Sequence, residues 1–441
     1  MVWFGRPEAA PKPVNWKWNL AALWASQFIS LSAFSFCLPF LALYIRNRQI
    51  VPEGEVLQWA SILNAVPSFS MMIFAPIWGI MGDRYGRKMM LVRANLAGGF
   101  VLYLMGVVDS IEGLIVLRIL HGAFTGTVPA AQTLVATNTP DRNQGFAIGV
   151  IMAAVNAGTM AGNYFGGLCA EHFGPVFSFK LGGVLLFLST ALVVFAVREN
   201  FVKPVTLPSA NTRSARLRRR RDSINSFKSG IPILLVIGYV SFLYVYDSPY
   251  LSLYVDEIFR HSPAASGMTD EAVTSRVFGV TGWVSAVASI AATLGSVVVG
   301  IVMDKKLPAV VWAATAAVCA VGAVWIGSDA SLFGLTAGRV VYLFFLSGLG
   351  SSLVVLLGRM TPSSKRGAAM GWAMTTRSIG WVVGPLTGGY ISAKLGWSSS
   401  YLFLAGFSAA LIPMFLSLYW RYPQAFYPDE EATPESEAEN E

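Results

Sequence analysis

Twelve apolar stretches constrain this chain more than any other feature of its sequence. A helix needs about 20 residues to cross the hydrocarbon core of a bilayer, and each stretch is long enough to do so. The expected spans are residues 19–44, 57–80, 89–108, 113–137, 145–169, 176–197, 231–255, 274–302, 308–327, 331–358, 366–392 and 398–420. Only 13% of the 441 residues are charged, against roughly 25% in soluble domains. The sequence therefore predicts an all-α integral membrane protein with twelve transmembrane helices.

A polar segment rich in arginine divides the predicted spans into two sets of six. We expect the following order along the chain: an N-terminal tail over 1–18, a six-helix bundle over 19–197, a basic linker over 198–230, a second six-helix bundle over 231–420 and an acidic tail over 421–441. A basic segment between spans is typical of a solvated linker beside anionic lipid. We therefore expect no nucleic-acid partner.

Lysine and arginine are distributed unevenly between the two sides of the predicted membrane. Most of them fall in the tails, the linker and the loops that follow even-numbered spans. Because loops kept in the cytoplasm carry this excess, both termini are predicted to be cytoplasmic. The first apolar run is too long for a signal peptide and has no small-residue cleavage site, so we expect it to stay as the first span. These features suit a multi-pass protein of a bacterial inner membrane.

The two halves of the chain repeat one another at a constant offset. The glycines Gly158, Gly162 and Gly166 of the fifth span correspond to Gly380, Gly384 and Gly388 of the eleventh, and Arg118 corresponds to Arg339. Duplicated six-helix halves around a midplane site are typical of secondary transporters. The repeat therefore predicts two pseudo-symmetric six-helix bundles.

The repeated glycines have a predicted role in packing. Glycine at four-residue spacing forms one smooth face, which lets a partner helix approach closely in lipid. Pro385 adds a soft point to the eleventh span. A single glycine face is explained equally well by static packing or by a moving gate. Because the face occurs in both halves of the chain, a moving gate is favoured.

Few ionisable residues lie inside the predicted spans, and each is a candidate functional residue because buried charge is costly there. They are Arg118, His121, Asp247, Arg339 and Arg377. The helical rise places Arg118, Asp247 and Arg339 at similar depth. We expect Asp247 to pair with Arg118 or Arg339, either as a proton-coupling pair or as a structural one. His121 is a candidate for the same coupling or a packed hydrogen-bonding residue.

Further residues of the first and seventh spans are candidates for a substrate cavity. Phe34 and Tyr246 supply aromatic surface, and Gln27 supplies a polar group. Aromatic walls with few fixed polar groups suit amphipathic ligands of varied shape. Three arginines against one aspartate favour anionic or zwitterionic substrates over simple cations.

The loop between the second and third spans carries a dense motif of charges and glycines. Its defining residues are Gly79, Asp83, Arg84, Gly86, Arg87 and Lys88. The motif resembles the loop signature of the major facilitator superfamily. The loop residues also have a physical interpretation of their own. Asp83 is placed to accept hydrogen bonds from Arg87 and from the free amides that start the eleventh span near Gly367, which would latch the cytoplasmic side. Topogenic charge alone is the alternative.

Two helix motifs narrow this resemblance to the twelve-span drug:proton antiporter branch of bacteria. Arg118-x-x-x-Gly122-x-x-x-Gly126 resembles the motif of its fourth helix, and the glycine run that ends at Gly166-Gly167 resembles its antiporter motif. The opening Asn15-Trp16-Lys17 is similar to that of MdtG-type multidrug exporters. Asn163 departs from the antiporter motif, where proline is usual. The resemblance implies alternating-access efflux of small amphipathic molecules in exchange for protons.

The same fold serves other functions that the sequence leaves open. A metabolite transporter (exporter, symporter or facilitator) is the main alternative, and a sensor that binds substrate without flux is another. No phosphate-binding loop or zinc-protease motif occurs, and Cys37, Cys169 and Cys319 have no metal-ligand spacing. We therefore expect no enzyme, catalytic residue, metal or cofactor. The expected partners are a small molecule, protons and the bilayer, and we expect a monomer.

Overall fold

The computed structural model describes residues 15–124, 126–199, 230–304, 309–361 and 366–422. All regular structure in these ranges is helical, and every predicted span overlaps a helix or a pair of helices. Ten segments of the described residues are long and apolar enough to cross a membrane. The predicted all-α membrane fold is confirmed.

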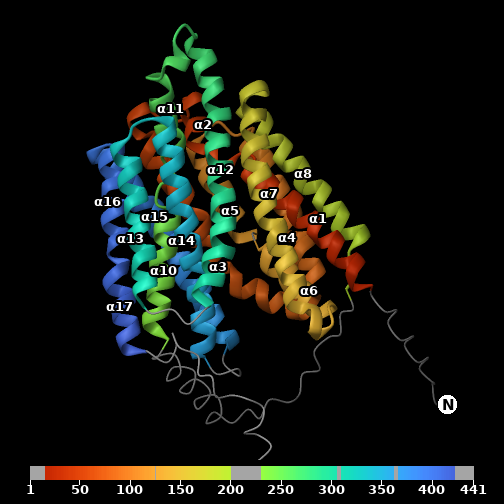
Figure 1. Cartoon of the computed structure of the whole chain (residues 1–441). Coiled ribbons are helices and arrows are strands. Elements are labelled where there is room, and N and C mark those ends of the chain that lie inside the picture. Colours follow the sequence, from red (N-terminus) through yellow and green to blue (C-terminus); the bar gives the residue numbers. More distant parts are fainter. Residues whose placement is uncertain (1–14, 125, 200–229, 305–308, 362–365, 423–441) are drawn as a thin grey trace, which may run out of the picture.

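The helices form two groups that lie side by side (Figure 1). The first group is α1 (Trp16–Ser35), η1 (Leu38–Phe40), α2 (Leu41–Asn47), η2 (Glu53–Glu55), α3 (Val56–Tyr85), α4 (Arg87–Met105), α5 (Ile111–Phe124), α6 (Thr127–Asn138), η3 (Asp141–Asn143), α7 (Gln144–Phe173) and α8 (Pro175–Ala196). The second group is α10 (Ile231–Val245), α11 (Leu251–Arg260), η4 (Pro263–Ala265), α12 (Asp270–Asp304), α13 (Ala309–Ser328), α14 (Leu332–Met360), α15 (Arg366–Leu395), α16 (Trp397–Ala409) and α17 (Leu411–Arg421). We call these groups the first and second bundles. The segment 200–229 between them lies outside the described residues.

The first and seventh spans are each interrupted by a proline. Pro39 separates α1 from α2, and Pro249 separates α10 from α11. Proline has no backbone N–H to continue a helix, so each span turns at that point. The two breaks occupy equivalent positions in the two halves. Gly166 and Gly388 correspond in the repeat, and a side chain added at Gly166 would meet the carbonyl of Phe36, just as one added at Gly388 would meet that of Tyr246. Each of these carbonyls comes three residues before the proline.

The two glycine faces lie inside the bundles. Gly158 and Gly162 of α7 pack on the backbone of α1, where an added Cβ would meet the carbonyls of Phe28 and Ser32. Gly384 of α15 packs on α10 in the same way, since a Cβ added there would lie 2.6 Å from the carbonyl oxygen of Phe242. These faces let each bundle close around its own helices. A role of theirs in gating stays a prediction.

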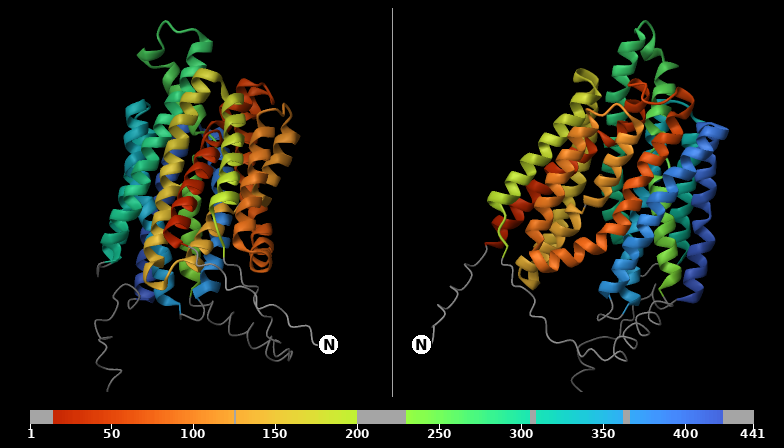
Figure 2. Two further views of the ribbon diagram at one scale, coloured as in Figure 1. Left: turned by 90° about the vertical axis from the view of Figure 1, so that its right-hand side faces the viewer. Right: turned by 180° about the vertical axis from the view of Figure 1, so that it is seen from behind.

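The bundles touch each other only over part of their length. We call the side with Trp16 and Arg421 the terminal face, and the opposite side, with α2 and α11, the distal face. Near the distal face, an added Cβ at Gly167 of α7 would lie 2.8 Å from Gly282 of α12. Toward the terminal face, an added Cβ at Gly149 or Gly371 would meet nothing within 4 Å. Among the described residues, the bundles are therefore in contact near the distal face, and their helices diverge toward the terminal face (Figures 1 and 2).

Candidate functional site

A central cavity of about 310 Å³ lies between the two bundles. Phe34, Asn64 and Asn163 line it from the first bundle, and Asp247, Ser285 and Arg339 line it from the second. Both proline breaks border it as well, through Leu38 and Pro39 on one side and Ser248 on the other. The cavity therefore meets irregular backbone from both halves, as is typical for substrate sites of secondary transporters.

Asp247 and Arg339 form an ion pair in this cavity. Their side chains are 14% and 10% exposed, and the hydroxyl of Tyr401 donates a second hydrogen bond to Asp247 at 3.2 Å. Asp247 stands in the turn that Pro249 creates, and Arg339 lies on α14. Of the two partners expected from the sequence, the structure brings Arg339 to Asp247. Removing either member would leave a poorly solvated charge behind.

Arg118 is held in a different way. Its side chain is buried, its Nε donates to the carbonyl of Leu63 at 2.6 Å, and its Nη1 lies 3.2 Å from His121 Nδ1. Because the guanidinium can only donate, Nδ1 must accept, which requires a neutral imidazole. The ring of Phe34 stacks on that imidazole at 5.1 Å. The structure thus makes His121 a hydrogen-bonded, packed residue that orients Arg118.

The internal repeat explains why the two arginines differ. Since Phe36 corresponds to Tyr246, the next residue, Cys37, corresponds to Asp247. Arg118 corresponds to Arg339. The first bundle therefore keeps the arginine and lacks the carboxylate, so the charge in the cavity region is asymmetric.

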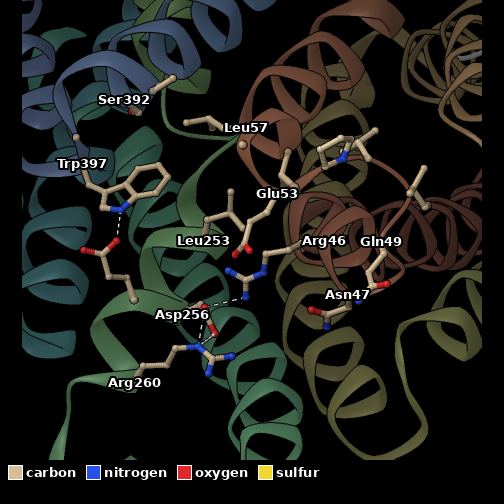
Figure 3. A pocket seen from close by; sticks show the side chains of 18 of the residues that line it. Arg46, Asn47, Gln49, Glu53, Leu57, Leu253, Asp256, Arg260, Ser392 and Trp397 are labelled. Atoms are coloured by element: carbon tan, nitrogen blue, oxygen red, sulfur yellow. Dashed lines mark hydrogen bonds and ion pairs between the residues drawn. The ribbon is translucent and has the colours of Figure 1, made fainter.

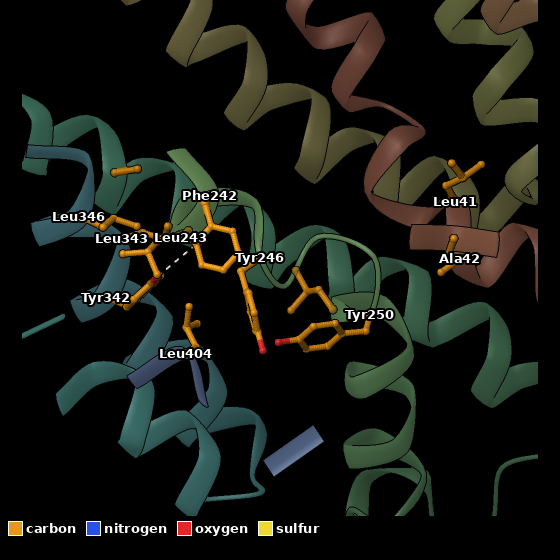
Figure 4. Packing of buried hydrophobic residues seen from close by; sticks show 14 of the residues in the cluster. Leu41, Ala42, Phe242, Leu243, Tyr246, Tyr250, Tyr342, Leu343, Leu346 and Leu404 are labelled. Atoms are coloured by element: carbon orange, nitrogen blue, oxygen red, sulfur yellow. Dashed lines mark hydrogen bonds between the residues drawn. The ribbon is translucent and has the colours of Figure 1, made fainter. Parts of the chain in front are cut away.

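Three other predicted residues lie around or away from this cavity. Arg377 stacks over Trp381 at 5.4 Å. Gln27 is fully buried in the first bundle, and neither polar atom of its amide has a hydrogen-bond partner among the residues that the structure describes. The expectation that Tyr246 lines the cavity is wrong. This tyrosine is buried in the second bundle, where its ring packs against Phe242 and its hydroxyl donates to the carbonyl of Ser400 at 3.3 Å (Figure 4).

Tyr244 lines the cavity in place of Tyr246 and lies near Arg339 and Arg377. Sequence reasoning missed it. A signal was available, because Tyr244 precedes Asp247 by three residues, and this spacing puts two side chains on one face of a helix.

The loop motif marks the junction of α3 and α4. Gly86 has a φ of 94°, a conformation that favours glycine. Glu199 accepts hydrogen bonds from the backbone N–H of Arg87 at 2.7 Å and of Lys88 at 2.9 Å, which caps the start of α4. Nothing in the sequence pointed to Glu199.

Other motif residues lie in different surroundings. The Lys88 ammonium donates to the carbonyl of Val194 at 2.8 Å, Arg84 lies over the ring of Tyr85, and Gly79 has open space around it. The side chain of Asp83 and the surroundings of Gly367 lie outside what the structure describes. The latch between them stays a prediction.

A second pocket opens at the distal face, with a volume of about 1250 Å³ (Figure 3). Arg46 of the first bundle and Arg260 of the second both bind Asp256, at 2.7 and 2.9 Å. The hydrogen bonds that Arg260 donates to Asp256 raise the pKa of Arg260. Arg276 of α12 binds Glu171 of α7 at 2.6 Å. Two ion pairs therefore cross between the bundles here, and the sequence predicted neither.

Comparison with known proteins fits this architecture. The chain matches the family model of the Major Facilitator Superfamily over residues 23–275 and 272–438. It is 28% identical over 401 residues to the multidrug resistance protein MdtG of Salmonella schwarzengrund (strain CVM19633), covering 89% of this chain and 93% of that protein. The MdtG protein of Klebsiella pneumoniae (strain 342) is also 28% identical, over 406 residues, with 90% and 92% covered.

Solved structures share the fold at low sequence identity. The nucleoside transporter NupG has a TM-score of 0.68 at 14% identity, covering 92% of this chain and 99% of its own. A bacterial homologue of the human lysosomal transporter Spinster, in an inward-facing and unoccupied conformation, has a TM-score of 0.69 at 15% identity, with 95% and 98% covered. The chain belongs to the Major Facilitator Superfamily and is a membrane transporter, not an enzyme.

Proposed function

We propose that this transporter exports small amphipathic molecules in exchange for protons, by alternating access to the central cavity. The observation that carries the proposal is the ion pair of Asp247 and Arg339. Among the described residues that line the cavity, Asp247 is the only acid. A carboxylate at a midplane site, paired with one arginine, can take up a proton only by giving up that pair. Proton binding and the charge of the cavity are therefore coupled.

The state of the molecule suggests the order of events. The cavity is closed toward the distal face while the ion pair is intact, which corresponds to a deprotonated Asp247. We infer that this is the state that has released its proton at the terminal face and is ready to load substrate. After the bundles rock, Asp247 takes up a proton from the distal side as substrate leaves. The MdtG relatives, named as multidrug resistance proteins, support export of drug-like molecules.

The charge of the cavity region indicates the substrate class. Arg118 and Arg377 have no carboxylate partner among the described residues, whereas Arg339 is neutralised by Asp247. Phe34 and Tyr244 supply aromatic surface beside them. An anionic or zwitterionic amphiphile matches this combination better than a simple cation does.

We also place both termini in the cytoplasm of a bacterial inner membrane. The terminal face carries Arg84, Arg87 and Lys88 at the junction of α3 and α4, as expected for a cytoplasmic loop. The described helices of the two bundles then diverge toward the cytoplasm. A monomer suffices for the mechanism, because one chain supplies both bundles.

A metabolite transporter is a second candidate, and one observation favours it. Several side chains of the cavity wall are neutral and hydrogen-bonding, and Asn163 donates to Ser289 there at 3.1 Å. Such side chains suit a polar solute with hydroxyl or amide groups. Under this alternative the Asp247–Arg339 pair would be structural.

Proton movement in proteoliposomes separates the two candidates. The reconstituted protein is given an inside-acidic gradient, and the lumenal pH is followed while anionic, zwitterionic and cationic amphiphiles are added in turn. We expect substrate-dependent proton release that Asp247→Asn abolishes. Asp109→Asn, which alters an exposed ion pair with Arg48 at the distal face, serves as the matched control and should behave as wild type. Substrate flux without proton movement would instead make this protein a facilitator, with Asp247 and Arg339 a structural pair.

A further inference from the structure

Arg93 lies on the side of α4 that faces away from the protein. It shares a helical stripe with Met89, Leu96 and Phe100, which are all exposed apolar residues. The opposite side of α4 is buried, and its main contacts are with α8 and other helices of the first bundle. In a membrane, this stripe faces lipid. A guanidinium therefore sits on the lipid-facing surface of a transmembrane helix.

The surroundings of the guanidinium leave part of it unsatisfied. It lies 3.6 Å from the centre of the Trp78 ring on α3, and the indole N–H is already donated to the carbonyl of Ala123 at 2.5 Å. Stacking occupies a face of the guanidinium, whereas its N–H donors point outward in its plane. Nε and Nη1 are shielded from solvent, and no described residue accepts a hydrogen bond from the guanidinium. Nη2 is not among the shielded atoms, so it is the donor that an anionic acceptor from the membrane can reach.

The depth of Arg93 indicates where that acceptor comes from. It stands six residues after Arg87, so its Cα lies about 9 Å along the helix from the terminal end of α4. Side chains in a helix point back toward its N-terminus, and a long arginine side chain reaches further in that direction. The guanidinium thus comes to the level of the lipid head groups, beside the basic end of α4 at Arg87 and Lys88.

We infer that Arg93 and Trp78 form a binding site for the phosphate group of a phospholipid in the leaflet at the terminal face. The shared chemistry would also fit a free phosphate ion. The apolar residues Met89 and Leu96 on either side of Arg93 favour a phosphate that carries acyl chains, which would cover them. The bound lipid joins α3 to α4 directly next to the loop motif.

The test uses the full-length protein, purified in detergent and stripped of lipid. Phosphatidylglycerol, diacylglycerol with the same acyl chains and inorganic phosphate are added separately, and bound lipid and Tm are measured by native mass spectrometry and thermal unfolding. We expect phosphatidylglycerol alone to bind tightly and raise Tm, with an affinity at least about tenfold lower for Arg93→Gln. The affinity of Arg93→Lys for phosphatidylglycerol should lie between those of wild type and Arg93→Gln, because lysine keeps the charge but lacks the planar guanidinium.

Arg421→Gln is the matched control, since Arg421 also stacks over an aromatic ring, Tyr422, at the terminal face but is exposed. It should bind phosphatidylglycerol as wild type does. Equal binding by Arg93→Gln and wild type would overturn the inference, and so would inorganic phosphate matching the lipid. Should Arg93→Gln fail to fold, the wild-type protein decides alone, because equal responses to diacylglycerol and phosphatidylglycerol would also refute a phosphate site.

Discussion

Arg46 and Asp256 join the two bundles across the distal face, where their Nη2 and Oδ2 atoms lie 2.7 Å apart. Arg46 ends the first span and Asp256 lies in α11 of the seventh. The carboxylate is almost completely buried and also binds Arg260 from its own helix. The pair exists only while the distal face is closed, so it stabilises that state relative to one in which the bundles have separated there.

Replacing Asp256 by asparagine should therefore shift the molecule toward opening at the distal face. The three native cysteines are buried, so a cysteine introduced by Asn64→Cys can report access to the central cavity. We expect an impermeant maleimide added from the distal side to react about tenfold faster in the Asp256→Asn background. Asp109→Asn, which alters an ion pair within the first bundle, is the control and should leave the rate unchanged. An unchanged rate with Asp256→Asn would show that the pair does not hold the face closed.

The ion pair in the cavity predicts a pattern of stability changes. Arg339→Gln leaves Asp247 buried without its main partner, and we expect a loss of about 3 kcal/mol in unfolding free energy. Adding Asp247→Asn should restore much of that loss, because no stranded charge remains. Thermal unfolding in detergent measures both variants. If the double variant were less stable than Arg339→Gln, the two residues would not be coupled.

The glycine faces predict a contrast between two similar substitutions. Gly162→Ala places a methyl group against the carbonyl of Ser32, so α1 and α7 must move apart, at a cost of about 1–3 kcal/mol. Gly149→Ala on the same helix meets open space and should be neutral or slightly stabilising. Comparing the Tm of the two proteins tests the packing directly. Equal Tm values would show that the α1–α7 interface tolerates a side chain.

The spans could be predicted from the sequence because bilayer thickness fixes the length of an apolar helix. The ion-pair partner of Asp247 could not be predicted in this way. Asp247 reaches Arg339 on α14, which contacts α10 in the same bundle, whereas Arg118 binds Leu63 and His121 in the first bundle. A count of residues along a helix cannot show which helices are neighbours. Tyr244 lines the cavity and Tyr246 does not, since residues two apart point to different sides of a helix, and only the structure shows which side meets the cavity. Glu199 and Asp256 act on residues far away in the sequence, so their roles depended on the folded structure.

The hydrogen bond between Arg118 and His121 yields a last prediction about proton coupling. Nδ1 of His121 accepts from Arg118, so the ring is neutral and has no proton to exchange at that nitrogen. His121→Asn keeps an acceptor near the guanidinium, and we expect it to transport with an unchanged pH profile. His121→Leu removes the acceptor and should lower the transport rate at every pH, because Arg118 loses its orientation. The measurement is the initial rate of substrate uptake into proteoliposomes between pH 5.5 and 8, a range that covers the usual titration of histidine at about pH 6.5. A pH profile that flattens in both variants would instead make His121 a proton carrier, and the coupling would then include the first bundle as well as Asp247.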